Sequence, residues 1–171
     1  SGWINHDLIA SGEKLPHINA FGGEERLWLG PEGGQFSIFF SKGKSFIFDD
    51  WQTPAFLDTD PYEVITSTDS SVLFTNDIET ENFSGTLFKS RIEREVTLLS
   101  EKEIVNLISS DVGNINYVAY RSKNTIINKG KATWRKETGL LSIWMLGMFN
   151  PSPSVVVVIP VNQGDEKLLG P

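Results

Sequence analysis

The sequence contains no cysteine and only two histidines and two methionines among its 171 residues. Without cysteine, the chain has no disulfide bonds, no thiol catalysis and no cysteine-ligated zinc site. It also contains no apolar run of about 18 residues, so we expect no helix that spans a membrane. Glycine-rich phosphate loops and the HExxH, GxSxG and EF-hand patterns are absent as well. We therefore expect neither a cofactor nor a metal site.

An excess of basic residues is missing too. Lys and Arg number 15 against 22 Asp and Glu, which gives a formal net charge of −7. Nucleic acids and anionic membranes require a basic face, so we expect neither as a partner. The cysteine-free composition is compatible with both the cytosol and the bacterial periplasm. We favour the periplasm or another exported location.

What the sequence does contain favours β-structure. Eleven Phe and five Trp are typical of sheets, because aromatic side chains fit a pleated surface. The 15 Gly and eight Pro are spread along the chain, as expected for short strands joined by turns. The length and a 39% apolar content suit one domain with a core. We predict a single antiparallel β-sandwich over residues 1–171, all-β with at most one or two short helices.

Alternating apolar residues indicate where the strands lie. Residues 35–40 and 45–48 read as a hairpin around the turn at 42–44. Further strands are predicted at residues 3–9, 25–29, 62–68, 71–76, 86–99, 116–120, 124–128, 131–135, 140–146 and 155–161. Ser100 and Glu103 match a capping box, which predicts a helix that ends by 111–113. The predicted core consists of Phe36, Ile38, Phe40, Phe88, Ile92, Val96, Ile143 and Val157.

The run at 155–161 is almost entirely β-branched, which is typical of a strand covered on both faces. Little sequence follows it that could supply the cover. We therefore predict that the chain is the N-terminal part of a larger sandwich, with a missing C-terminal segment, or that it self-associates.

The stretch at 21–40 is the main candidate for a site. Two Gly-Gly pairs bracket Arg26, Trp28 and Glu32, and glycine allows the backbone to turn sharply on both sides. Carboxylates and arginine bind sugar hydroxyls, and an aromatic face takes the apolar side of a sugar ring. We predict that these three residues line an open polar cleft that binds a carbohydrate, with Trp51 and Arg94 as further members.

Each of these residues also has a purely structural interpretation. Arg26 and Trp28 share a face in an extended segment and can form a cation–π pair. Trp51 can pack on the core after a hairpin. Arg94 lies on the apolar face of 86–99, so its charge must be paired, reach a polar cavity or extend to water. The turn Asp58-Thr59-Asp60 is too short for a calcium loop and is interpreted as solvated.

Four segments resemble the galactose mutarotase-like superfamily, the aldose 1-epimerase type of β-sandwich, and are nearest to an uncharacterised bacterial group within it. They are GWINHDLI (2–9), GGEERLWLGPEGGQF (22–36), FDDWQTP (48–54) and SKNTIINKGKATWRKETGLLSIWMLGMFNPSP (122–153). The resemblance covers nearly the whole chain. It implies a supersandwich fold and a mono- or oligosaccharide ligand.

The chain departs from the mutarotase pattern in its catalytic groups. Mutarotases use a histidine acid and a late carboxylate base. His6 and His17 lie in no matching motif, and each is interpreted as a surface or turn-packing residue. The late carboxylate has no counterpart. Three hypotheses follow: a carbohydrate-binding mutarotase-like protein, an active aldose 1-epimerase or other sugar-processing enzyme, and a structural or interaction sandwich without a small ligand.

Overall fold

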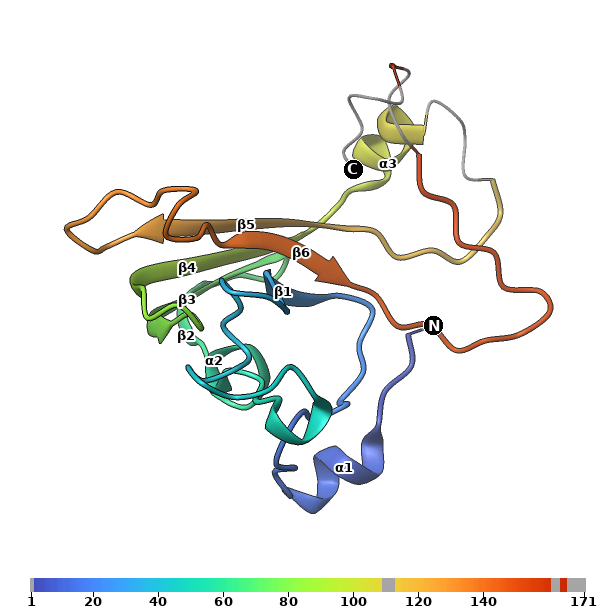
Figure 1. Ribbon diagram of the computed structural model, residues 1–171. Coiled ribbons are helices and arrows are strands. Elements are labelled where there is room, and N and C mark those ends of the chain that lie inside the picture. Colours follow the sequence, from blue (N-terminus) through green and yellow to red (C-terminus); the bar gives the residue numbers. More distant parts are fainter. Residues whose placement is uncertain (1, 109–112, 161–163, 166–171) are drawn as a thin grey trace.

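The computed structural model describes residues 2–108, 113–160 and 164–165. Within these residues, six strands and a few short helical segments follow one another along the chain (Figure 1). In order they are α1 His6–Ser11, β1 Arg26–Gly30, the 3-10 turn η1 Phe48–Asp50, α2 Ala55–Asp58, β2 Glu63–Ser67, β3 Ser71–Glu81, β4 Leu87–Leu98, α3 Glu101–Ile108, β5 Tyr120–Asn128 and β6 Ser142–Leu146.

The larger sheet has four antiparallel strands in the order β2-β3-β4-β5. Its central strands are long, with Ser71 opposite Thr97 and Glu81 opposite Leu87. In β4 the even-numbered residues Phe88, Ser90 and Ile92 are buried, as its alternation predicted. This face of β4 is therefore the one that faces the core.

The smaller sheet pairs β1 with β6, two strands far apart in sequence, with Trp28 opposite Trp144. Figure 1 shows it lying against the larger sheet, with α1 and α2 below the strands and α3 above. The residues of β1, of the loop at 38–40 and of α2 join the inner faces of β3 and β4 in one apolar cluster. The predicted all-β, antiparallel, sandwich-like fold is confirmed.

The core prediction holds for most of its residues. Ile38, Phe40, Phe88 and Ile92 are buried. Phe36, Val96 and Ile143 are half-buried, and Ile143 packs against the apolar cluster. Val157 is 58% exposed, so its assignment to the core was wrong.

The predicted hairpin at 35–48 does not form. Ser37 and Phe39 are buried together with Ile38 and Phe40, so neither side of this segment faces water as a half-buried strand would. Its backbone groups bond to loops instead of a ladder: the carbonyl of Ser37 accepts from Phe83 N at 2.8 Å, and that of Phe39 from Gln52 N at 2.9 Å. Tertiary packing of the aromatic rings has overridden the alternating pattern.

The strand or extended segment predicted at 3–9 holds only at its start, where Ile4 forms a β-bridge with Gly22, and helix α1 begins at His6. The side chain of Asn5 accepts from Leu8 N at 3.1 Å and caps its first turn, and Gly12 ends it in the left-handed region at φ 66°. With α2 and α3, the described residues contain three short α-helices rather than the one or two predicted. Helix α3 begins with the predicted capping box, in which Glu103 accepts from Ser100 N at 2.9 Å and the Ser100 hydroxyl accepts from Glu103 N at 3.4 Å. Its end was predicted by 111–113, of which 111 and 112 lie outside the described residues and Gly113 is not helical.

Two further predicted strands are absent. Residues 116–119 are irregular, and β5 begins only at Tyr120. After β5 the chain does not return as a strand at 131–135, because Asn128 holds a tight turn by donating to the carbonyl of Ala132 at 2.8 Å. The amides of Lys129 and Gly130 donate to the carbonyl of Lys89 on β4. A loop therefore lies along the end of β4 in place of a hairpin.

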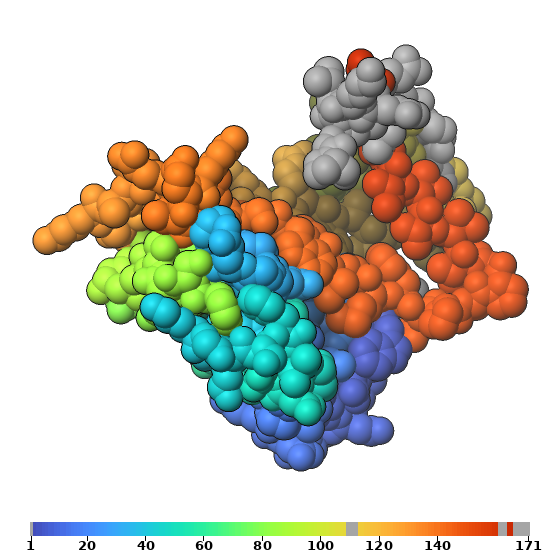
Figure 2. All heavy atoms as spheres, in the orientation of Figure 1, coloured from blue at the N-terminus to red at the C-terminus, as the bar shows by residue number. Residues whose placement is uncertain are grey.

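The β-branched run at 155–160 is not a strand in the described residues, which exclude position 161. Val156, Val158 and Ile159 are 78–80% exposed. Figure 2 shows this orange-red segment as part of an arm that runs outward after β6. No strand lies beside it in the described part of the chain. The predicted covered strand is thus wrong for these residues.

Among the residues described, none of the helices combines the length and apolarity needed to cross a membrane.

Candidate functional site

Strands β1 and β4 bring two of the predicted site residues, Arg26 and Arg94, to one cavity. Its volume is about 240 Å³. The lining residues are Glu25, Arg26, Leu27, Phe56, Leu57, Asp58, Asp60, Tyr62, Phe74 and Arg94. We call it the Arg26–Arg94 cavity. It combines two guanidinium groups and three carboxylates with aromatic side chains, which is the mixture expected of a site for a hydroxylated ligand.

Arg26 is held rigidly at this cavity. Its Nη2 lies 2.7 Å from Asp58 Oδ1, and the two side chains are only 12% and 5% exposed. Arg26 also donates to the carbonyls of Asn19 at 2.9 Å and Leu57 at 3.3 Å, while Asp58 accepts from the backbone and side chain of Asn19. Both charges are thus satisfied within the protein. Their first role is to fix the loop around α2 on β1, because breaking a buried pair leaves an uncompensated charge.

Arg94 is bound more loosely. Its Nη2 lies 3.3 Å from Glu25 Oε1, and its Nη1 donates to Asn124 Oδ1 at 2.9 Å. Glu25 also accepts a short hydrogen bond from the hydroxyl of Ser122 on β5. The Arg94 and Glu25 side chains are 16% and 15% exposed. The sequence-based expectation that Arg94 needs a partner on its apolar face is met by Glu25 at the start of β1.

The pKa values of two tyrosines, Tyr62 in the cavity wall and Tyr120 near Glu25, reflect burial and the charges around them. Burial raises the pKa of Tyr62 to about 12, and the nearby charge of Arg94 offsets part of this effect. The pKa of Tyr120 is also raised, first by burial and then by the charges of Glu25 and Glu24 and a hydrogen bond to Glu25. Both phenols therefore stay protonated at neutral pH. A protonated Tyr62 hydroxyl can donate and accept hydrogen bonds at the cavity wall.

Trp28 does not line the cavity as a stacking platform. It is 2% exposed and its ring stacks on Phe39 at 5.6 Å, with Trp144 edge-on at 6.0 Å. Its indole N–H donates to Glu32 Oε1 at 2.7 Å, so Glu32 serves to satisfy a buried donor. The guanidinium carbon of Arg26 lies 5.0 Å from the centroid of the Trp28 ring, so the two side chains form the cation–π pair that the structural interpretation expects. Neither Trp28 nor Glu32 is among the lining residues.

Trp51 also has a structural role, because it packs on the core. It lies 4.5 Å from Phe39 and 5.5 Å from Phe40 by ring centroids and packs against the core. Its indole N–H donates to the hydroxyl of Thr53 at 2.8 Å. Trp51 does not line the Arg26–Arg94 cavity. Of the five predicted residues, only Arg26 and Arg94 line this cavity, while Trp28 contacts both Glu32 and Arg26 but does not line it.

Sequence reasoning missed the partners that complete the cavity: Glu25, Asp58, Asp60 and Tyr62. Glu25 stands in the same charged stretch as Arg26 but was not selected. The run Asp58-Thr59-Asp60-Pro61-Tyr62 places two carboxylates and an aromatic residue after one short helix, which is a usable signal for a polar wall. What links this run to Arg94 is the packing of α2 beneath β1, which local sequence does not encode.

The described residues offer no other obvious chemistry at this place. Neither His6 nor His17 lines the cavity, and His17 Nδ1 instead lies 2.8 Å from the carbonyl of Trp51. Within the described ranges, no group of three or more His, Cys, Asp or Glu side chains is placed to hold a metal ion. The cavity can therefore bind a polar ligand through hydrogen bonds but shows no imidazole acid or base.

Comparison with known proteins places the chain in one family. A model described as a family of unknown function (DUF6786) matches residues 1–169, so the chain belongs to that family. No curated protein matches the sequence, and no solved structure matches it. The family description assigns no activity, so the functional argument depends on the geometry of the cavity.

Proposed function

We propose that this member of the DUF6786 family is a carbohydrate-binding protein, similar to the galactose mutarotase-like sandwiches, and that its ligand is a neutral sugar held in the Arg26–Arg94 cavity. The observation that carries the proposal is the meeting of Arg94, Glu25, Asp60 and Tyr62 around one space. Together they offer charged donors, charged acceptors and a phenol hydroxyl, the groups that bind neighbouring sugar hydroxyls.

The size of the cavity favours a single sugar ring. At about 240 Å³ it lies just below the range of about 300–1,000 Å³ that is usual for small-molecule pockets. Phe56, Tyr62 and Phe74 supply apolar surface for the ring carbons in the role first assigned to Trp28. Arg94 and Glu25 already pair with each other, so a neutral ligand fits better than an ion that would disturb the pair.

Binding is a better supported function than epimerase catalysis. An aldose 1-epimerase must deliver a proton to the ring oxygen while it removes one from the anomeric hydroxyl. The cavity contains carboxylates that can accept a proton, but its only phenol has a pKa of about 12, which makes it a poor acid at neutral pH. An active epimerase therefore remains the alternative with less support.

The burial of Trp28 favours a second candidate, a structural sandwich without a small ligand. In this reading the Arg26–Asp58 pair and the Trp28–Glu32 bond stabilise the loops and have no further role. The two candidates differ in Asp60, which is exposed at the cavity and whose side chain forms no hydrogen bond or salt bridge with the residues that the structure describes. In the binding hypothesis this carboxylate accepts hydrogen bonds from sugar hydroxyls, whereas in the structural hypothesis it is a solvated turn residue.

The test compares Asp60→Asn with Asp69→Asn, the same isosteric change in the turn between β2 and β3. Neutral mono- and disaccharides are titrated into each protein and followed by NMR. We expect the wild type and Asp69→Asn to bind one sugar with a dissociation constant of about 1 mM, close to −4 kcal/mol. Loss of a charge-assisted hydrogen bond should weaken binding by Asp60→Asn about tenfold. No shift at high millimolar sugar would favour the structural sandwich, and equal affinity in the two variants would contradict a sugar site that uses Asp60.

A further inference from the structure

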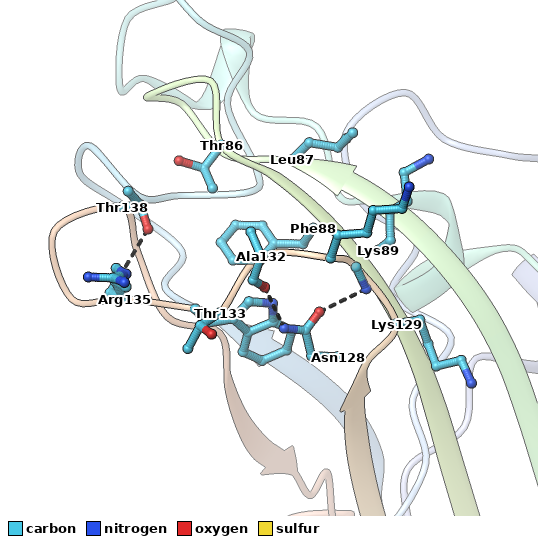
Figure 3. A pocket seen from close by; sticks show the side chains of 13 residues that line it. Thr86, Leu87, Phe88, Lys89, Asn128, Lys129, Ala132, Thr133, Arg135 and Thr138 are labelled. Carbon is cyan, nitrogen blue, oxygen red and sulfur yellow. Dashed lines mark hydrogen bonds between the residues drawn. The ribbon is translucent and has the colours of Figure 1, made fainter.

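A second and larger cavity lies beside the first residues of β4, beyond the last residue of β5. Its volume is about 650 Å³. It is lined by Thr86, Leu87, Phe88, Lys89, Asn128, Lys129, Gly130, Lys131, Ala132, Thr133, Trp134, Arg135 and Thr138 (Figure 3). We call it the Phe88–Trp134 cavity. It shares no residue with the Arg26–Arg94 cavity.

The loop that forms its wall is held at both ends. The Asn128 side chain accepts from Gly130 N at 2.9 Å and donates to the carbonyl of Ala132. At the other end, the buried Asn82 amide donates to the carbonyl of Thr138 at 2.9 Å. Trp134 packs edge-on against Phe88 at 5.5 Å between these points. The cavity is therefore formed before any ligand arrives, which lowers the entropic cost of binding.

The charge of this cavity is opposite to that of the protein. The lining contains Lys89, Lys129, Lys131 and Arg135 but no Asp or Glu, in a chain with net charge −7. Lys89 pairs with Glu79 at 2.7 Å. Lys129 forms no salt bridge with the described residues but lies near Asp77, whose pKa its charge helps to lower. Lys131 and Arg135 form no salt bridge with any residue that the structure describes. Cations left unpaired around a concave surface attract an anionic ligand.

The cations lie apart from one another, with apolar surface between them. Figure 3 shows Arg135 at one end and Lys129 at the other, with Phe88 and Ala132 between. Lys129 and Lys89 extend away from the Phe88 ring. The site thus suits an elongated ligand with negative charge at both ends and ring carbons in the middle.

We propose that the Phe88–Trp134 cavity binds an acidic oligosaccharide, with uronate carboxylates at Arg135 and Lys129 and sugar rings against Phe88 and Trp134. Its volume exceeds that of the Arg26–Arg94 cavity more than twofold, which leaves room for several sugar rings. The inference uses other residues than the neutral-sugar site and stands if that site fails. A nucleic acid is a less fitting polyanion because the remaining surface carries a large excess of acidic residues.

The probe is a tetramer of galacturonic acid, titrated into the full chain by calorimetry at low and at physiological salt. The fully methyl-esterified tetramer has the same rings without charge and is the ligand control. The protein variant is Lys129→Gln with Arg135→Gln. Its matched control is Lys102→Gln with Arg121→Gln, which removes the same charge from exposed residues outside the cavity.

We expect the acid tetramer to bind the wild type and the matched control equally, within about twofold. Loss of two exposed charge contacts should weaken binding by the cavity variant about tenfold, and physiological salt should weaken the wild type severalfold. The ester should bind at least about tenfold more weakly, since it has no ions to pair. Equal weakening in both double variants, or equal binding of acid and ester, would overturn the proposal. So would tighter binding of a single-stranded oligonucleotide of equal charge, which would indicate a general polyanion surface. Neutral monosaccharide binding, measured in the same variants, should not change and so reports on the other cavity alone.

Discussion

The two cavities of this protein share strand β4 but differ in charge, because the arginines of one are paired with carboxylates and most cations of the other are not. Arg94 and Phe88 lie six positions apart on the inner side of β4, which is about 20 Å along a strand. At the Arg94 end, each arginine has a carboxylate partner within 3.3 Å. At the Phe88 end, three of four cations have no ion-pair partner in the described chain.

This difference determines what each cavity can recognise. A guanidinium that is already neutralised offers directed hydrogen bonds but little net field, which suits hydroxyl groups. Unpaired cations offer a net positive field that draws anions and is weakened by salt. Because one strand supports both cavities, changes to β4 should affect them together, and changes to individual charges should separate them.

The largest effect is expected at the scaffold that the cavities share. Ile92 is fully buried on β4 between Arg94 and Phe88. Ile92→Asp places an unpaired charge in the core, so we expect no folded protein and no binding at either cavity. Ile92→Val should cost only about 0.5–1.5 kcal/mol and keep both cavities. The check is cooperative thermal melting followed by circular dichroism. A soluble Ile92→Asp protein that melts cooperatively would show that this face of β4 is not the core.

The next largest effect separates a buried ion pair from an exposed one of the same chemistry. Asp58 pairs with Arg26 and is 5% exposed, whereas Asp77 pairs with Arg91 and is 62% exposed. We expect Asp58→Ala to reduce the free energy of unfolding by about 3–5 kcal/mol, because it strands a buried charge. Asp77→Ala should cost far less, because an exposed ion pair contributes little to stability. Urea denaturation measures both, and equal losses would contradict a structural role for the Arg26–Asp58 pair.

A smaller effect should appear in alkali. Folded Tyr62 titrates at about 12, while the unfolded residue titrates near 10. Between these pH values the unfolded state loses a proton that the folded state keeps, so stability falls as pH rises from 10 to 12. The full shift of about two pKa units corresponds to about 3 kcal/mol.

Replacement of Tyr62 by Phe removes this group and isolates its contribution. Absorbance of tyrosinate in the wild type minus Tyr62→Phe should show one phenol with its midpoint near 12, and the variant should lose less stability between pH 10 and 12. A midpoint near 10 would mean that Tyr62 is solvated and that the wall of the Arg26–Arg94 cavity is open.

Much of the larger sheet could be predicted from the sequence. The alternation of β4 assigned Phe88 and Ile92 to the correct face. The other strands were located less completely, since β3 was predicted only over 71–76 and β5 only over 124–128. The same alternation placed Arg94 on that face and required a partner for it. It could not name Glu25, because β1 reaches β4 only through packing of distant segments.

The candidate site was predicted less well, for a physical reason. Alternation correctly placed Arg26 and Trp28 on one face of β1. Burial of that face depends on Phe39, which lies in a buried loop although its sequence alternates like a strand. The run at 155–159 shows the reverse case, in which β-branched residues remain exposed because no described strand pairs with them. The periodicity of apolar residues depends only on the local sequence, so it does not indicate which distant segment covers a face.

The most direct measurement observes the arginine Nε–H groups of both cavities in one NMR spectrum. Signals of Arg94 and Arg135 are assigned with the Arg94→Lys and Arg135→Lys variants, and a neutral monosaccharide is titrated to high millimolar concentration, followed by the galacturonate tetramer. We expect the neutral sugar to shift the Arg94 signal and leave Arg135 unchanged, and the acidic tetramer to shift Arg135. If no neutral sugar in a broad panel moves the Arg94 signal, the Arg26–Arg94 cavity is not a carbohydrate site.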